Sequence, residues 1–191
     1  MKQLILASAS PRRKQLLEQI GLKFIIDPSD IDEIVDAKLS PRKQVELFSQ
    51  QKAEAVAAKH PDALVLATDS MVALDGKVFG KPKNREHAKE MLRALSGKKH
   101  TIITAFTLLD AASGKAISKS VEVSVWFRKI ANTEIERYLN RAKPFDKAGA
   151  YAIQGLAAVF VEKIEGDYPG AVGLPLFDLA KTLKAFGVEV L

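Results

Sequence analysis

The stretch "LASASPRRKQLLEQIG", residues 6–21, joins the end of an apolar strand to the beginning of a helix. Ser10 stands at the N-cap position, Pro11 occupies the first helical position, and Gly21 ends the pattern. A strand that leads directly into a helix is the building unit of α/β proteins. The stretch therefore predicts that the fold class is α/β.

The rest of the chain repeats this alternation of strand-like and helix-like segments. "ALVLATDSMVAL" at 63–74 predicts a buried strand, and the Asp75–Gly76 pair after it predicts a hairpin turn. Further strands are expected over residues 2–7, 78–79, 100–109, 117–128 and 156–164, and further helices over residues 41–59, 84–95, 133–140 and 175–186. We expect a single domain over residues 1–191, a length that can bury a sizeable core.

The composition is that of an ordinary globular protein, with 47% apolar and 27% charged residues. The net charge of +6 suggests attraction to an anionic partner, although on charge alone a solvated basic surface is the more frequent explanation. The absence of cysteine excludes a disulfide framework and a thiolate metal site. The apolar run in "MKQLILASAS" is too short for a secretory signal or a membrane span, so we expect a cytoplasmic protein.

Two arginines, Arg12 and Arg13, stand in the first turn of the first expected helix. The helix dipole opposes each of them there by about 0.3–1 kcal/mol. The same place is where α/β proteins often bind phosphate, and Ser8 and Ser10 add hydroxyl donors. A phosphate bound by both guanidiniums would offset the cost. The alternative is that the arginines point to solvent or pair with a carboxylate such as Glu18.

Three other charged residues stand at positions that a purely structural role explains poorly. Lys52 falls within the apolar stripe of its helix, so it either extends to the edge or meets an anion. Asp69 interrupts an apolar strand, and unless it only caps a turn, it needs a cation, a metal or a proton to move. Glu33 belongs to an acidic cluster that is either a solvated loop or a source of an oxygen ligand for Mg²⁺.

Several familiar catalytic motifs are missing. "GKVFGKP" at 76–82 lacks the spacing of a P-loop, although Lys81 remains a candidate phosphate contact. The histidines lack the spacing of zinc ligands. The sequence also lacks a nucleophile elbow and a convincing Ser/His/Asp set, which argues against covalent catalysis.

A later segment, "KPFDKAGAYAIQG" at 143–155, is rich in small residues and lets the backbone approach a ligand closely. The Gln154 amide suits a nucleobase edge, and Tyr151 is nearby in sequence. This segment and "GDYPGAVGLPL" at 166–176 can also be interpreted as plain turns.

Taken together, these motifs resemble the Maf family of nucleoside triphosphate pyrophosphatases over nearly the whole chain. The stretches that carry the resemblance are "ASASPRRKQLL", "DE" at 32–33, "KA" at 52–53, "ATDS" at 67–70, "GKP" at 80–82, "LSGKKH" at 95–100, "DKAGAYAIQG" and "VGLPL" at 172–176. The resemblance implies an inosine-triphosphatase-like fold, with an elongated mixed sheet flanked by helices and two lobes around a cleft. It also implies a homodimer that cleaves nucleotides between the α and β phosphates with the help of Mg²⁺ or Mn²⁺.

The same resemblance implies roles for individual residues. Asp69 would be the proton acceptor that activates water, and Glu33, together with Asp69, would bind the divalent cation. Ser8 would contribute to substrate binding. The triphosphate would be neutralised by Arg12, Arg13, Lys52 and Lys81.

The combination of Arg12, Ser70 and Gln154 resembles the branch of the family that acts on dTTP and UTP, rather than the branch that prefers 7-methyl-GTP. The chain has Ser70 where Thr is usual, Ala152 where Gly is usual, and Met71 as a further departure. A single methyl group changes discrimination by only about 1–3 kcal/mol, so these departures bear more on base preference than on the reaction.

Two other functions stay open. The family is linked with inhibition of septum formation, so the chain could be a nucleotide-binding regulator with little hydrolysis. Such a binder needs the cations but neither Asp69 nor Glu33. A nucleic-acid-binding domain would use the basic surplus with exposed aromatic residues, a pattern only loosely suggested by Trp126, Phe127 and Tyr138.

Overall fold

The computed structural model describes residues 2–191 and contains a seven-stranded mixed sheet in the order β2-β1-β3-β5-β6-β7, with β4 paired to β3. The strands are β1 (Leu4–Leu6), β2 (Ile25–Ile26), β3 (Leu64–Leu74), β4 (Lys77–Phe79), β5 (Lys99–Asp110), β6 (Ala116–Phe127) and β7 (Val161–Glu165). The α-helices are α1 (Pro11–Gln19), α2 (Pro41–Ala57), α3 (Arg85–Leu95), α4 (Asn132–Ala142), α5 (Tyr168–Val172) and α6 (Leu176–Lys184). Two 3-10 helices complete the chain, η1 (Ala148–Ala150) and η2 (Gly155–Phe160). The expected fold class, a mixed sheet flanked by helices, is confirmed.

Contacts within the chain define two compact units. Unit 1 comprises Met1–Asp69, Thr104–Val121 and Gly173–Leu191, and unit 2 comprises Ser70–Ile103 and Glu122–Val172. Strands β3, β5 and β6 contribute residues to both units, so the division does not cut the chain into consecutive domains. The expectation of a single domain stays a prediction. Between residues 2 and 191, no helix has both the length and the apolar character that crossing a membrane requires.

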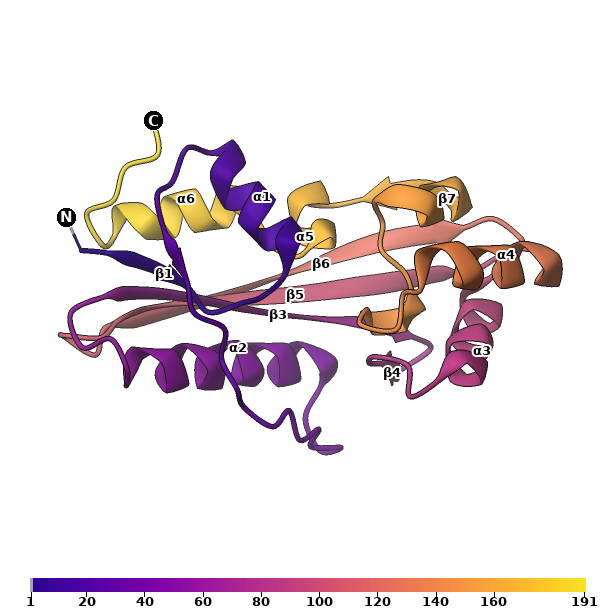
Figure 1. Ribbon diagram of the computed structural model, residues 1–191, viewed down its shortest axis with the longest axis horizontal. Coiled ribbons are helices and arrows are strands. Elements are labelled where there is room, and N and C mark those ends of the chain that lie inside the picture. Colours follow the sequence, from indigo (N-terminus) through magenta and orange to yellow (C-terminus); the bar gives the residue numbers. More distant parts are fainter. Residues whose placement is uncertain (1) are drawn as a thin grey trace. The chain divides into compact units, whose positions relative to one another are not determined.

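The sheet of unit 1 explains which way its side chains face. Strand β1 pairs in parallel with β2 and with β3, and Ile5 lies opposite Val65. These two side chains belong to the core cluster that includes residues of α2. Figure 1 shows α2 on one side of these strands, with α1 and α6 on the other. Since side chains alternate along a strand, Asp69 projects with Val65 toward α2, and Thr68 projects toward the opposite face.

The helices begin close to their expected positions, but their caps differ. Ser40 caps α2, because its hydroxyl accepts a hydrogen bond from the backbone N–H of Lys43 at 3.3 Å. Ser10 has the extended N-cap conformation, yet its side chain makes no capping hydrogen bond. Its own backbone N–H instead donates to Ser8 Oγ at 3.3 Å. Helix α1 therefore begins without a side-chain cap.

The strand expected over residues 156–164 is wrong in its first half, where the 3-10 helix η2 precedes β7. Ala157 and Phe160 are both buried. A 3-10 helix places residues three apart on the same face, so one side of η2 covers the core. Short apolar runs do not distinguish a strand from a buried helical turn. Strand β2 and helix α5 were not expected, because each is too short to show a periodic pattern.

Unit 2 buries a histidine within an aromatic cluster. His100 is 2% exposed, and its Nε2 lies 2.6 Å from the hydroxyl oxygen of Tyr151. The rings of Phe127 and Tyr151 both meet the imidazole edge to face. Burial lowers the pKa of His100 to about 4, against a smaller opposing effect of the Lys98 backbone. His100 is therefore neutral in the folded protein at neutral pH.

We expect the folded state to lose stability as the pH falls from 6.5 to about 4, the His100 pKa values without and with burial. The unfolded chain binds the additional proton in this range, so the contribution is complete above the upper value and disappears toward the lower one. This contribution of His100 to the free energy of unfolding amounts to at most about 3 kcal/mol. Urea unfolding at several pH values measures it, with His100→Gln as a variant that cannot titrate. An equally steep pH dependence in both proteins would contradict the assignment.

Candidate active site

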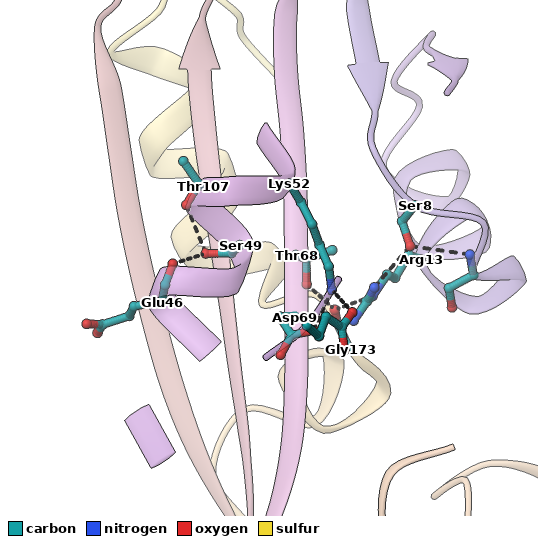
Figure 2. Close-up of polar contacts among 11 residues, drawn as sticks. Ser8, Arg13, Glu46, Ser49, Lys52, Thr68, Asp69, Thr107 and Gly173 are labelled. Atoms are coloured by element: carbon teal, nitrogen blue, oxygen red, sulfur yellow. Dashed lines mark hydrogen bonds and ion pairs between the residues drawn. The ribbon is translucent and has the colours of Figure 1, made fainter. Parts of the chain in front are cut away.

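Lys52 lies between two carboxylates in unit 1. Its Nζ is 2.6 Å from Asp69 Oδ1, a contact visible in Figure 2, and 2.7 Å from Glu33 Oε1. Lys52 and Asp69 are only 8% and 6% exposed, whereas the Glu33 side chain is 34% exposed. The three charges come from α2, from β3 and from the loop before α2. The three charged groups meet at one place, where Lys52 and Asp69 are buried and Glu33 is partly exposed to solvent.

Local sequence patterns bring Lys52 and Asp69 together. Lys52 lies four residues after Phe48 and four before Val56, so all three side chains share the face of α2 that covers the sheet. Asp69 lies on the face of β3 that α2 covers, as the alternation along the strand requires. Lys52 therefore meets an anion inside the interface instead of extending to its edge.

The pKa of Asp69 is raised. Burial is the largest cause, because it disfavours the charged carboxylate, and the nearby charge of Glu33 acts in the same direction. The charges of Lys52 and Arg13, together with the hydrogen bond from Lys52, oppose this rise without cancelling it. A carboxylate that binds protons more readily than usual, and that lies beside cations, has the character of a general base.

Two hydrogen bonds anchor the Arg13 side chain. Its Nη1 donates to Ser8 Oγ at 3.0 Å, and its Nε donates to the backbone carbonyl of Gly173 at 3.2 Å. Ser8 is buried at the end of β1, and Gly173 lies in the turn between α5 and α6. Two segments therefore hold one guanidinium: the end of β1, which is close in sequence, and the turn before α6, which is 160 residues away.

The electrostatics place Arg13 beside the carboxylates of the site. Burial lowers the pKa of Arg13, as does the charge of Arg12, while the charges of Asp69 and Glu33 raise it. Glu18, the alternative carboxylate, lies 3.6 Å from Lys14 Nζ. Arg13 is therefore a partly buried cation beside carboxylates and not a purely solvated one, and its contact with a substrate phosphate stays a prediction.

The residues predicted for the site divide between the two units. Unit 1 contains Ser8, Arg12, Arg13, Glu33, Lys52 and Asp69. Unit 2 contains Ser70, Lys81 and Gln154, of which Lys81 and Gln154 are exposed. Ser70 follows Asp69 on β3, so its side chain projects from the other face of the strand.

Aromatic residues that the sequence suggested for base contacts are largely buried. Tyr151 packs in the core of unit 2 against His100, so its ring is not presented to a ligand. Phe127 and Tyr138 are buried as well. Two of the three aromatic residues suggested for nucleic-acid stacking are thus core residues, which weakens that alternative.

Sequence reasoning missed two residues of this site, Thr68 and Gly173. The Thr68 hydroxyl donates to the Gly173 carbonyl at 3.0 Å. Thr68 faces away from Asp69 on β3, and Gly173 belongs to "VGLPL" at 172–176, a stretch that indicates the family but no role for this residue. No pattern in the sequence indicated that this turn comes back to β3.

The donor set suits a divalent cation that also binds phosphate. Glu33 and Asp69 both face the Lys52 ammonium, so their oxygens converge on one cationic position. Mg²⁺ in nucleotide enzymes is commonly held by one or two carboxylates, with the substrate phosphates as further ligands. Across residues 2–191, the structure has no group of three or more His, Asp or Glu side chains arranged for a metal. Glu33 and Asp69 are the carboxylates that this site offers to a cation.

The site combines a buried carboxylate on a strand, a lysine beside it and an anchored arginine at the start of a helix. In an α/β protein, these features are typical of a class that binds polyanions and reacts with them. The chain belongs to the family described as Maf-like protein, whose model matches residues 3–186. The family expected from the motifs is confirmed.

Several relatives match along their whole length. A dTTP/UTP pyrophosphatase from Pelotomaculum thermopropionicum is 47% identical, with 100% of both chains covered. One from Alkaliphilus metalliredigens is also 47% identical, with 100% of both chains covered. A third, from Methanosarcina barkeri, is 46% identical, with 100% of this chain and 97% of the relative covered. The solved structure of the Staphylococcus aureus Ham1 protein shares 17% identity, with a TM-score of 0.48 over 66% of this chain and 72% of that one, which is a partial likeness.

Proposed function

We propose that this chain is a nucleoside triphosphate pyrophosphatase that hydrolyses dTTP and UTP to the monophosphate and pyrophosphate. Full-length relatives named dTTP/UTP pyrophosphatase support the substrate and the reaction. The observation that carries the chemistry is the buried Asp69 carboxylate, with a raised pKa, 2.6 Å from the Lys52 ammonium. A regulator that only bound nucleotides would need the cations but no such base.

In this mechanism Asp69 accepts a proton from the water that attacks the α-phosphorus. The bond to the bridging oxygen of the β-phosphate breaks, and pyrophosphate leaves with the electron pair. Arg13 and Lys52 are fixed cations that stabilise the charge growing on the phosphates. Their anchors are made before the substrate arrives, so little reorganisation is needed at the moment of reaction.

Glu33 and Asp69 would hold a divalent cation, Mg²⁺ or Mn²⁺, which when bound would neutralise phosphate charge and polarise the phosphoryl oxygens. Arg12 and Lys81 would add positive charge along the triphosphate, and Ser8 would contribute its hydroxyl. Ser70 and Gln154 would recognise the base. The family resemblance further supports a cytoplasmic homodimer whose partner is the nucleotide and neither a nucleic acid nor a membrane.

The test is pyrophosphate release from a panel of nucleoside triphosphates, with Mg²⁺ or Mn²⁺ and with identification of both products. We expect the monophosphate and pyrophosphate, and the fastest turnover with dTTP and UTP. Release of a diphosphate and inorganic phosphate would contradict the reaction. Tight nucleotide binding without any turnover would support the regulator instead.

Replacing Gln154 with Ala is expected to raise KM for dTTP and UTP about tenfold and to reduce the preference for them over CTP, because a base edge loses its hydrogen-bond partner. Steady-state kinetics with the three nucleotides measures this. Inorganic triphosphate, which has no base, is the control, and its inhibition constant should not change. Unaltered base preference would exclude Gln154 as the residue that reads the base.

A further inference from the structure

The carbonyl of Gly173 accepts two hydrogen bonds from two different elements, strand β3 and helix α1. Thr68 Oγ1 donates to it at 3.0 Å and Arg13 Nε donates at 3.2 Å (Figure 2). A carbonyl oxygen has two lone pairs, so these donors satisfy it. Thr68 is fully buried, which excludes water as an easy replacement for its hydroxyl. Strand β3 and helix α1 are thereby joined through one turn of the chain.

Thr68 and Asp69 are consecutive on β3 and face opposite ways. The carboxylate of Asp69 meets Lys52 beneath α2, and the hydroxyl of Thr68 meets the turn before α6. Two consecutive positions of β3 therefore place the Asp69 carboxylate and, through Gly173, an anchor of Arg13. The backbone of β3 and the Gly173 carbonyl thus connect the Arg13 guanidinium to the position of the Asp69 carboxylate.

Two donors hold the Gly173 carbonyl in a permissive part of the backbone. Gly173 has φ 128, a region that glycine adopts easily, so local sterics constrain it less than they would another residue. The hydrogen bonds from Thr68 and Arg13 therefore contribute to fixing the direction of this carbonyl. The planar Arg13 fork donates to Ser8 and to Gly173, so the direction of the Gly173 carbonyl influences the orientation of the guanidinium plane.

We propose that Thr68 is a positioning residue that acts through the Gly173 carbonyl to orient the Arg13 guanidinium for the phosphates of the substrate. The proposal rests on the proposed function, because it takes a nucleoside triphosphate as the ligand. Thr68 itself is buried and donates its hydroxyl to the Gly173 carbonyl, so its role is positioning and not catalytic.

Thr68→Val removes the hydroxyl with little change in volume, and Thr68→Ser keeps the hydroxyl but loses a buried methyl group. We expect Thr68→Val to raise both KM and the Kd for a non-hydrolysable dTTP analogue about tenfold, since a buried acceptor loses a donor. Thr68→Ser should bind like the wild type although it unfolds at a lower temperature. A merely structural residue would show the reverse order, with affinity following stability. If Thr68→Val does not fold, Thr68→Cys, a weak donor of similar volume, takes its place in the comparison.

Thr107→Val is the matched control. Thr107 is another fully buried threonine of unit 1, and its hydroxyl lies 2.9 Å from Ser49 Oγ and 2.8 Å from Ser118 Oγ. Losing this hydroxyl should lower the free energy of unfolding without changing the Kd for the analogue. A loss of affinity equal to that of Thr68→Val would overturn the proposal.

A double-mutant cycle tests whether Thr68 acts through Arg13. Arg13→Lys keeps the charge but removes the planar fork, so Thr68→Val should change the Kd less than twofold in that background. Additive effects, or a Thr68→Val variant with wild-type Kd, would overturn the proposal. The proposed function fails separately, if the wild type binds the analogue without hydrolysing any nucleoside triphosphate.

Discussion

Asp69→Asn is expected to lower the rate of pyrophosphate release about a thousandfold, the scale of a lost general base. Asparagine keeps the size of the side chain but cannot take up the proton of the attacking water. Nucleotide binding should persist, because the substitution removes a negative charge that faces the phosphates. Steady-state turnover of dTTP measures the loss of rate, and calorimetry with a non-hydrolysable dTTP analogue measures the retained binding.

Asp110→Asn provides the control for this variant. Asp110 is a carboxylate of unit 1 that pairs with Lys2 Nζ at 2.5 Å, whereas Asp69 pairs with Lys52. Its replacement should leave kcat unchanged. Turnover by Asp69→Asn within tenfold of the wild type would refute the assignment of Asp69 as the base.

The second large effect is expected from Lys52→Met. The substitution leaves Asp69 and Glu33 facing each other without the cation between them, in a site that is mostly buried. Breaking a buried pair by removing one partner destabilises proteins by about 3–5 kcal/mol, and the exposed part of Glu33 puts the expectation near the lower value. Turnover should fall at least about a hundredfold, because a fixed positive charge at the phosphates is lost. Urea unfolding and pyrophosphate release measure the two losses.

Lys43→Met is the matched control on the same helix. Lys43 Nζ pairs with Glu46 at 3.0 Å on the exposed surface of α2, where an ion pair contributes no more than about 1 kcal/mol. Its removal should change neither stability nor turnover appreciably. Equal destabilisation by both substitutions would mean that the pairing of Lys52 is unimportant.

The Lys52→Met variant also tests the proposed cation site without any measurement of activity. Two carboxylates that lack their ammonium partner should bind Mg²⁺ more strongly, so Mg²⁺ should raise the melting temperature of Lys52→Met more than that of the wild type. Replacing Glu33 with Gln in the same variant should remove the difference. A melting temperature insensitive to Mg²⁺ in both proteins would count against Glu33 and Asp69 as ligands.

Local patterns in the sequence were enough to select most of the unit 1 site. Lys52 stands out because a charge interrupts the apolar stripe of a helix, and Asp69 because a charge interrupts an apolar strand. Both anomalies are visible within a few residues of the chain, since helix and strand periodicity decide which face a side chain takes. The pairing of these two residues follows once α2 is known to cover β3.

The sequence by itself determined the α/β class, the major strands and helices, and the charged residues that needed partners, because these depend on short-range periodicity and turn chemistry. Only the tertiary structure decided that Lys52 bridges Glu33 and Asp69, and that the turn at Gly173 returns to hold Arg13 and Thr68. Those contacts join segments up to 160 residues apart. No local pattern encodes such a contact, because it results from how the whole chain packs.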